Sequence, residues 1–447
     1  MKRIIEAITN VFKIPDLRKK VFFTIGMLVL YRLGGHIPLP GINMGALERA
    51  FGSGEMGGLF GLYDMFVGGA FRRATIFATG IMPYITASII IQLLGAVIPY
   101  FQKLQREGEE GRRKITQYTR YGALVIAAAQ SLGMIAYLNN LNANSQSAVI
   151  NPALSGIPFT LLAVISLTTG AALIMWIGEL MTEKGIGNGM SILILVGIVS
   201  RLPGTFYQEA VLLMEGGRSI FSMFVVVLGI LFFIACAILL SQGTRQIPVQ
   251  YARKVAGRKV YGGSATHLPL KINAAGVIPI IFASAVMFIP TLIIGLLPDG
   301  GFKEVLTQAF MGGSFLYNII YGAIIVFFAY FYTAVIFNPV DVAENMKKYG
   351  GFIPGRRPGQ QTSAYIDKVL TRVTLPGAVG LALIAIVPVW FLQGVTGGTG
   401  GLQYAVGGTT LLILTGVIID TLQQVESHLL MRHYDGFMKK GRIRGRR

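Results

Sequence analysis

The amino-acid sequence predicts an all-α polytopic membrane protein with ten transmembrane helices arranged as two inverted five-helix halves. Three observations carry this prediction: the composition, the lengths of the uncharged runs and a motif that occurs twice. The chain has 447 residues, of which 53% are hydrophobic and only 13% are charged. A soluble protein has roughly twice that charged fraction. A bilayer is therefore the expected solvent for most of the chain.

Long runs without Asp, Glu, Lys or Arg give the positions of the spans. Each run exceeds the ~20 residues that cross a bilayer core, and together they cover 74–102, 121–178, 219–244, 272–298, 305–340 and 373–419. The second and last runs are long enough for two helices, because a polar stretch from Asn139 to Asn151 and a glycine-rich stretch from Gly394 to Gly408 divide them. Shorter apolar stretches at 21–38 and 187–205 complete the ten.

Basic residues orient the spans. Of the 39 Lys and Arg, 32 lie in alternate connections: the two tails, the segment 103–120, Lys184, and the segments 245–271 and 347–372. The loops near 139–157 and 394–408 carry no charge, so the positive-inside rule places both termini in the cytoplasm. For the tails, topology and contact with anionic lipids explain the charge without any further role.

These patterns predict four regions. Residues 1–20 form a cytoplasmic amphipathic segment, 21–206 an N-terminal half with helices 1–5, 207–424 a C-terminal half with helices 6–10 and cytoplasmic loops at about 241–271 and 338–372, and 425–447 a basic cytoplasmic tail. Acidic residues and a proline interrupt the first twenty residues, so we expect no cleavable signal peptide. The single Cys236 excludes an intrachain disulfide.

A nine-residue motif occurs twice. Gly80 to Ser88 in the second span and Gly276 to Ser284 in the seventh share Gly, Pro, Ile, Ala and Ser at equal positions. With five spans per half, consecutive halves enter the membrane from opposite sides, as inverted repeats do, and a central pathway between them follows. A chance match is the alternative, since Pro and small residues are common in membrane helices.

The apolar segment from Gly57 to Ala70 is too short to cross a bilayer and is broken by glycines. It can enter the membrane only if other helices shield its ends. A re-entrant half-helix that blocks a cavity and an interfacial loop helix explain this pattern equally well.

No motif of a soluble enzyme is present: there is no Walker-type loop, no nucleophile elbow and no pair of histidines at metal spacing. The glycines at 185, 187 and 189 precede a membrane span rather than follow a strand, which favours close helix packing over nucleotide binding. His428 and His433 are five apart and lie on different helix faces. We expect no enzyme activity, no cofactor and no metal.

Several motifs in order resemble the SecY family, the central subunits of the bacterial translocon. The resemblance covers essentially the whole chain and rests on Tyr31 to Gly34, Gly80 to Ser88, Gly111 to Ile115, Gly185 to Gly189, Ile247 to Tyr251, Leu268 to Asn273, Asn338-Pro339 and Gly351 to Gly359. It implies a pore-forming subunit in the bacterial plasma membrane. Such a subunit passes unfolded polypeptides through a central pore and releases signal-anchor and transmembrane segments sideways into lipid.

The resemblance also implies partners and moving parts. Energy would come from the translating ribosome or the SecA ATPase, with SecE and SecG as small subunits and signal sequences as substrates. A lateral gate is expected where the second span faces the seventh and eighth. A plug helix is expected at about 59–71, with apolar residues Leu59, Phe60, Leu62, Met65 and Phe66.

Six residues are predicted to form an apolar pore ring that stops ions by excluding water. Ile81 and Ile85 share one helix face, as do Met190 and Ile194. Ile278 comes from the second copy of the motif and Ile413 from the family resemblance. The lateral gate is predicted to carry the polar residues Thr86, Gln130 and Asn273. Ordinary helix packing is the alternative role for every one of these residues.

Two basic loops are predicted to dock partners. The loop 245–271 carries six bases and no acid, which suits ribosomal RNA or an acidic protein face. In the second loop, Arg356 and Arg357 lie between two Pro-Gly pairs that force turns. Arg356 stands where the family pattern suggests an aliphatic residue. The predicted docking set is Arg245, Arg253, Lys254, Arg258, Lys259, Arg356 and Arg357.

Two other classes of protein share some of these sequence features. A secondary transporter fits inverted repeats, but it usually carries ionisable groups at the bilayer midplane, and the runs 74–102 and 272–298 contain none. A purely structural scaffold does not explain basic loops whose arginines are fixed by turns.

Overall fold

The computed structural model describes residues 14–53, 64, 66–144, 148–251, 254–256, 259–261, 265–297, 300–310, 314–397 and 402–440. The chain divides into two compact units. The first contains Met1–Gln208, Phe288–Met311 and Val417–Arg447, and the second contains Glu209–Met287 and Gly312–Gly416.

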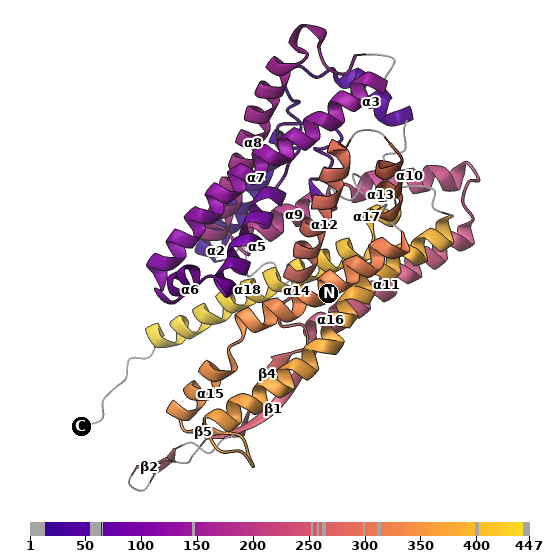
Figure 1. Cartoon of the computed structure of the whole chain (residues 1–447). Helices are drawn as coiled ribbons and strands as arrows, with labels where there is room; N and C mark the ends of the chain where they lie inside the picture. Colours follow the sequence, from indigo (N-terminus) through magenta and orange to yellow (C-terminus); the bar gives the residue numbers. More distant parts are fainter. Residues whose placement is uncertain are drawn as a thin grey trace. The chain divides into compact units, whose positions relative to one another are not determined.

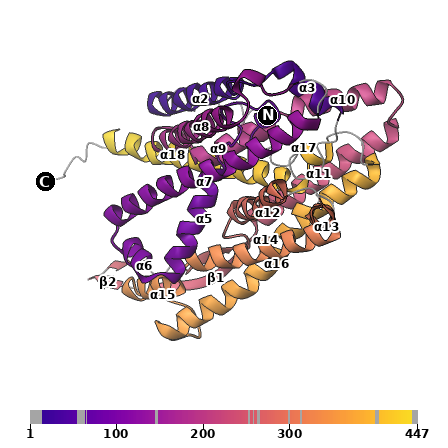
Figure 2. The same cartoon turned by 45° about the horizontal axis from the view of Figure 1, so that its top comes forward.

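The first unit is a helical bundle built on α8 (Figure 1). Helices α2, α7 and α9 pack against α8, and α5 lies along α7 (Figure 2). A 99° bend separates α5 from the short helix α6. Its elements are α2 (Pro15–Gly34), α3 (Met44–Ser53), α5 (Met82–Val97), α6 (Pro99–Arg106), α7 (Glu109–Asn144), η1 (Pro152–Leu154), α8 (Ile157–Lys184) and α9 (Gly189–Val199).

Local sequence explains where these helices begin. Proline stands in the first turn of α2, α5, α6 and α8, where its missing N–H leaves no hydrogen bond unmade. The side chain of Asn188 caps α9 by accepting hydrogen bonds from the backbone N–H groups of Met190 and Ser191. At the start of α9, Gly189 lies directly against the carbonyl of Gly178 in α8. This contact confirms the predicted close packing of the glycine turn.

The second unit is centred on α16, which packs along α11 and α14. Helix α10 (Leu202–Met214) leads into this unit, and α12 and α18 each have residues in both units. Helix α13 (Gly301–Phe310) belongs to the first unit. The remaining elements are α11 (Ile220–Gln242), β1 (Thr244–Tyr251), β2 (Lys254–Ala256), β3 (Lys259–Tyr261), β4 (Ala265–Lys271), α12 (Ile278–Leu296), α14 (Phe315–Ile336), α15 (Pro339–Lys348), β5 (Gly351–Phe352), α16 (Gln360–Thr396), α17 (Leu402–Ala405) and α18 (Gly408–Lys440).

The predicted spans coincide with helices. Helices α2, α5, α7, α8, α9, α11, α12, α14, α16 and α18 stand at the ten expected places. Within the described residues, seven helices are long and apolar enough to cross a membrane, and the bent pair α5 and α6 makes an eighth. The apolar part of α12 is shorter, at Ile278–Pro290.

The two polar connections of the second unit contain strands, where the sequence predicted only loops. Strand β1 pairs antiparallel with β4 on one side and with β5 on the other. Ile247 stands opposite Leu268, and Gln250 stands opposite Phe352. Strands β2 and β3 form a separate two-stranded hairpin. Connections far apart in the sequence are thus joined by one small sheet.

The two copies of the repeated motif have the same backbone geometry. Gly80 has φ +57° and Gly276 has φ +64°, a left-handed conformation that glycine adopts at no steric cost. In both copies the helix begins two residues later, at the start of α5 and of α12, and its second residue is proline.

The hydrogen bonds of the first turn match as well. The carbonyl of Ile81 accepts from the N–H groups three and four residues later at 3.1 and 3.2 Å, and the carbonyl of Val277 does the same at 3.2 and 3.3 Å. The repeat is therefore confirmed in the backbone conformation as well as in the amino-acid sequence.

Candidate pore, gate and docking sites

Four of the six predicted pore residues lie in the first unit. Ile81, the N-cap of α5, is buried, as are Ile85 on α5 and Ile194 on α9. Met190, at the start of α9, is half-buried, and its sulfur lies against Gly178 of α8. It packs on a cluster formed by Ala87, Ala123 and Met175 from α5, α7 and α8. The thioether therefore fills a gap between helices, as a flexible methionine does well.

The other two predicted pore residues lie in the second unit. Ile413 on α18 is fully buried, at 0% exposure, and Ile278 at the start of α12 is half-buried. One turn beyond Ile413, Gly416 lies directly against the side chain of Val277. The helices α12 and α18 therefore meet close to both residues, because the glycine has no side chain to hold them apart.

The matched backbones also fix the register of the repeat. Ile81 corresponds to Val277, and Met82 corresponds to Ile278. The repeat by itself therefore points to Val277 as the counterpart of Ile81. The assignment of Ile278 to the pore ring depends on the family resemblance.

The three predicted gate residues make no hydrogen bond to one another among the described residues. Thr86 donates to the carbonyl of Met82 in its own helix at 3.0 Å. Asn273 donates to the carbonyl of Gly276 at 3.0 Å, which holds the turn before α12. Gln130 on α7 is buried at 7% exposure, and its Oε1 atom has no hydrogen-bond partner in the described part of the chain.

Most of the predicted plug lies outside the described residues, including Leu59, Phe60, Leu62 and Met65. Phe66 is described and buried. The segment that follows it leads into α5, and its Val67 side chain lies against Gly80.

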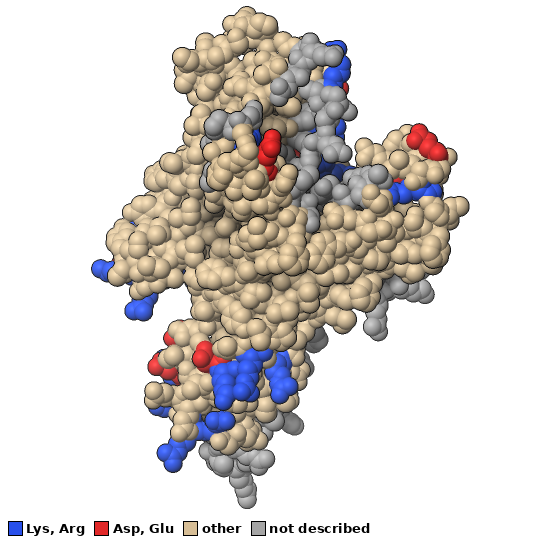
Figure 3. Space-filling model, turned by 45° about the vertical axis from the view of Figure 1, so that its right-hand side comes forward, with Lys and Arg blue, Asp and Glu red and all other residues tan. Residues whose placement is uncertain are grey.

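The predicted docking residues fall into two groups. Arg245 on β1 is exposed, as are Arg356 and Arg357 between β5 and α16. Arg253 and Arg258 lie outside the described residues, and for Lys254 and Lys259 only the backbone strands β2 and β3 are described. Lys and Arg side chains gather at the end of the second unit that carries the sheet, next to helical surface that has almost none (Figure 3).

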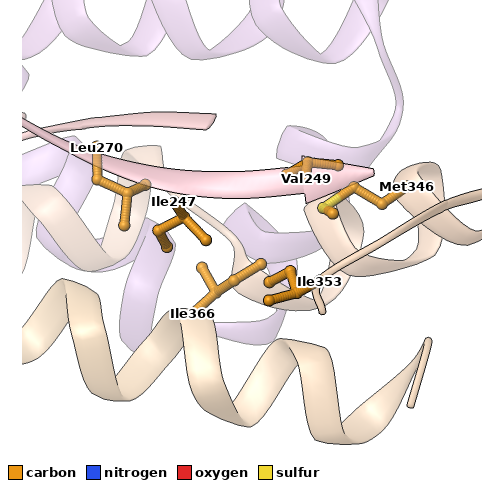
Figure 4. Close-up of a cluster of buried hydrophobic side chains, with 6 residues drawn as sticks. All are labelled: Ile247, Val249, Leu270, Met346, Ile353 and Ile366. Carbon is orange, nitrogen blue, oxygen red and sulfur yellow. The ribbon is translucent and has the colours of Figure 1, made fainter. Parts of the chain in front are cut away.

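The sheet has a hydrophobic core of its own. On β1, Ile247 and Val249 are buried and their neighbours are exposed, so one face of the strand packs inward. Figure 4 shows that face meeting side chains from β4, α15, the β5 loop and α16; the cluster is Ile247, Val249, Leu270, Met346, Ile353 and Ile366. We call β1, β4, β5, α15 and the first turns of α16 the platform.

The two arginines stand on a loop that the platform holds firmly. The N–H of Arg356 donates to the carbonyl of Ile353 at 3.0 Å, and Ile353 is itself buried in the core. The buried hydroxyl of Thr362 donates to the carbonyl of Arg357 at 2.9 Å. Gly355 and Gly359 adopt φ +79° and +103° on either side. These contacts fix the backbone before and after the arginine pair.

The two guanidinium groups have different surroundings. That of Arg356 lies over the ring of Tyr365, with 4.7 Å between its central carbon and the ring centre. Arg357 is exposed and makes no ion pair or side-chain hydrogen bond with the described residues. The Arg356 side chain therefore lies against the first turns of α16, whereas the Arg357 side chain is exposed.

Comparison with known proteins identifies the family. The SecY family model matches residues 75–422. The protein translocase subunit SecY of Thermotoga maritima is 44% identical over 446 residues, which cover 99% of this chain and 100% of the relative.

Two solved structures share the fold. One describes how the plug domain of the SecY protein stabilises the closed state of the translocation channel; its TM-score is 0.64, at 17% identity over 92% of each chain. The other is Sec61 in the canine ribosome-channel complex, with a TM-score of 0.60 at 16% identity over 92% of each chain. The chain therefore belongs to the SecY family and is a multi-pass membrane subunit of the Sec translocase, a protein-conducting channel and not an enzyme.

Proposed function

We propose that this subunit lies in the bacterial plasma membrane with both termini in the cytoplasm. The alternate basic connections support this orientation, since 32 of 39 Lys and Arg fall in them. Family membership argues against the two alternatives, a secondary transporter and a structural scaffold. In this orientation the platform faces the cytoplasm, where partners and substrates arrive.

The observation that carries the proposed pathway is the backbone match between Gly80 and Gly276. It gives α5 and α12 equivalent starts, and each of these helices carries predicted pore residues. We infer that Ile81, Ile85, Met190, Ile194, Ile278 and Ile413 line a constriction through which an unfolded polypeptide passes. An ion there would lose hydration without gaining ligands, so an aliphatic ring stops ions and still yields to a chain.

Sideways release of signal sequences and membrane segments requires a gate between helices. We infer that Thr86, Gln130 and Asn273 contribute to that gate. The buried Oε1 of Gln130 supports this role, because an unsatisfied buried acceptor is costly and is relieved when a partner or water reaches it.

The platform is the proposed docking surface for the ribosome and SecA. The platform core joins both predicted docking loops into one folded body. A partner could therefore contact the basic loop 245–271 and the loop with Arg356 and Arg357 at the same time. Arg357 would contact the partner, and Arg356 would brace the loop through Tyr365. The canine structure, a ribosome-channel complex, supports a ribosome as one partner. SecE and SecG are proposed as small membrane partners, and anionic lipids as contacts of the basic tails.

The test is to purify the protein from gently solubilised membranes and identify what accompanies it. Ribosomes, SecA or a small single-span subunit are the expected companions. Reconstituted vesicles should translocate an unfolded secretory protein into their lumen when SecA and ATP are added outside. Uptake of small solutes without any of these partners would contradict the proposal.

A further inference from the structure

A buried ion pair joins two distant parts of the first unit. The Nη1 atom of Arg201 lies 2.7 Å from Oδ2 of Asp64. The Asp64 side chain is only 1% exposed, and that of Arg201 is 29% exposed. The second carboxylate oxygen, Oδ1, accepts a hydrogen bond from the backbone N–H of Arg72 at 2.8 Å. Because a buried charge without its partner is strongly unfavourable, this pair fixes where Asp64 sits.

The same aspartate organises the segment that leads into α5. The N–H of Gly69 donates to the Asp64 carbonyl at 2.9 Å, so the chain turns tightly around this residue. Further along, Val67 packs against Gly80, where a Cβ atom would lie 2.9 Å from a Val67 methyl group. Asp64 and the segment 66–80 are therefore held together immediately before α5 begins.

This segment is seated on the C-terminal end of α9. A Cβ atom on Gly197 would lie 2.7 Å from the carbonyl oxygen of Phe66, so only glycine allows this approach. Ser200 extends the contact, because its hydroxyl donates to the carbonyl of Gly197 at 2.7 Å and accepts from Arg32 at 2.9 Å. Arg201 follows directly and reaches Asp64.

We propose that Asp64 and Arg201 are positioning residues that hold the start of α5 against α9 and thereby set the seal of the closed channel. Ile81 is the N-cap of α5, Ile85 lies in its first turn, and α9 carries Met190 and Ile194. The inference needs the established channel activity, and it stays valid whichever aliphatic residues form the constriction. A chain without the pair conducts ions at rest and accepts defective signal sequences.

The molecule supplies a matched control. Glu209 and Arg218 also form a buried ion pair, with 3.1 Å between Nε and Oε2 and side-chain exposures of 1% and 6%. This pair belongs to the second unit, whereas Asp64 and Arg201 belong to the first. Glu209→Gln therefore measures what the loss of a buried ion pair does to the protein in general.

The experiment compares Asp64→Asn, Arg201→Gln, the double variant and Glu209→Gln in the full membrane-inserted channel. Ion conductance is recorded in planar bilayers, and export of a protein with a defective signal sequence is measured in cells, each normalised to inserted protein. We expect about a tenfold rise in resting conductance for each single variant, because breaking one side of a buried pair is strongly destabilising. The double variant should leak no more than the worse single variant, since the same interaction is lost.

Glu209→Gln should keep the wild-type conductance and signal stringency. Conductance at the wild-type level in the Asp64→Asn/Arg201→Gln double variant would overturn the proposal, and this variant leaves no unpaired buried charge that could prevent folding. Equal leak in Glu209→Gln would also overturn it, because the effect would then be a general loss of stability. Leak in pore-ring variants without leak in the double variant would reject the ion pair and retain the ring.

Discussion

The guanidinium carbon of Arg356 lies 4.7 Å from the centre of the Tyr365 ring, across the loop that enters α16. Tyr365 in turn packs on the platform core. A cation–π contact of an exposed guanidinium contributes about 0.5–1 kcal/mol, enough to favour one loop conformation. Arg357, the next residue, is left exposed at the loop's tip.

The two arginines should therefore fail differently when replaced. Arg357→Ala should remove most of the platform's contribution to SecA or ribosome affinity, because its exposed guanidinium is the group that a partner reaches. Arg356→Ile should reduce affinity only a few-fold, in line with the roughly 0.5–1 kcal/mol of the stack. Binding of the purified channel to SecA by titration measures both. Equal losses for the two variants would contradict the division of roles, and Arg356→Lys serves as the charge-matched control.

Charge reversal in the loop 245–271 should weaken docking and make it less sensitive to salt. Arg253→Glu with Lys259→Glu removes two bases from a loop that has no acid, and each lost phosphate contact lowers the salt slope. Ribosome co-sedimentation at several salt concentrations is the measurement. Replacing both residues by Gln separates lost attraction from new repulsion. If binding persisted while the membrane topology inverted, these bases would serve orientation alone.

Asn273→Leu should change how stringently the channel selects signal sequences. The substitution removes the 3.0 Å hydrogen bond to the carbonyl of Gly276 and so loosens the turn that starts α12. A hydrogen bond within membrane proteins contributes about 0.6–2 kcal/mol, a few-fold effect on gating. Export of proteins with strong and weak signals should shift toward the weak ones. Thr374→Val is the comparison, since the buried hydroxyl of Thr374 donates to the carbonyl of Leu370 within α16 at 2.8 Å and Thr374 is not a predicted gate residue. Unchanged export of both classes by Asn273→Leu would remove Asn273 from the gate.

Ile413→Asn and Ile278→Asn should make the resting channel leak. An amide in a dry constriction supplies hydrogen bonds to water, wets the seal and weakens the closed state. The readouts are conductance in planar bilayers and export of proteins with defective signals. Ile413→Leu keeps the apolar volume and should behave like the wild type. If both Asn variants kept wild-type conductance and stringency, the pore assignment would be wrong although the family is established.

The sequence by itself determined the membrane architecture and the family. Spans are visible because a bilayer core demands about 20 apolar residues in a row, and the uncharged runs satisfy this locally. The repeat was also visible in the sequence. Gly80 and Gly276 adopt the left-handed conformation because glycine lacks a side chain, which is a property of each position alone. Ten helices stand where ten spans were expected.

The tertiary structure alone decided the contacts between distant segments. The placement of Ile247 and Val249 at alternate positions indicates a strand with one buried face. The residues around Gln250 do not indicate that this strand pairs with Phe352. Asp64 is the one acid in the apolar segment 57–70, which indicates that it needs a buried partner. The sequence does not indicate that this partner is Arg201. Pairing partners depend on how helices and strands pack in space, and packing energy is shared among residues that lie far apart in the chain.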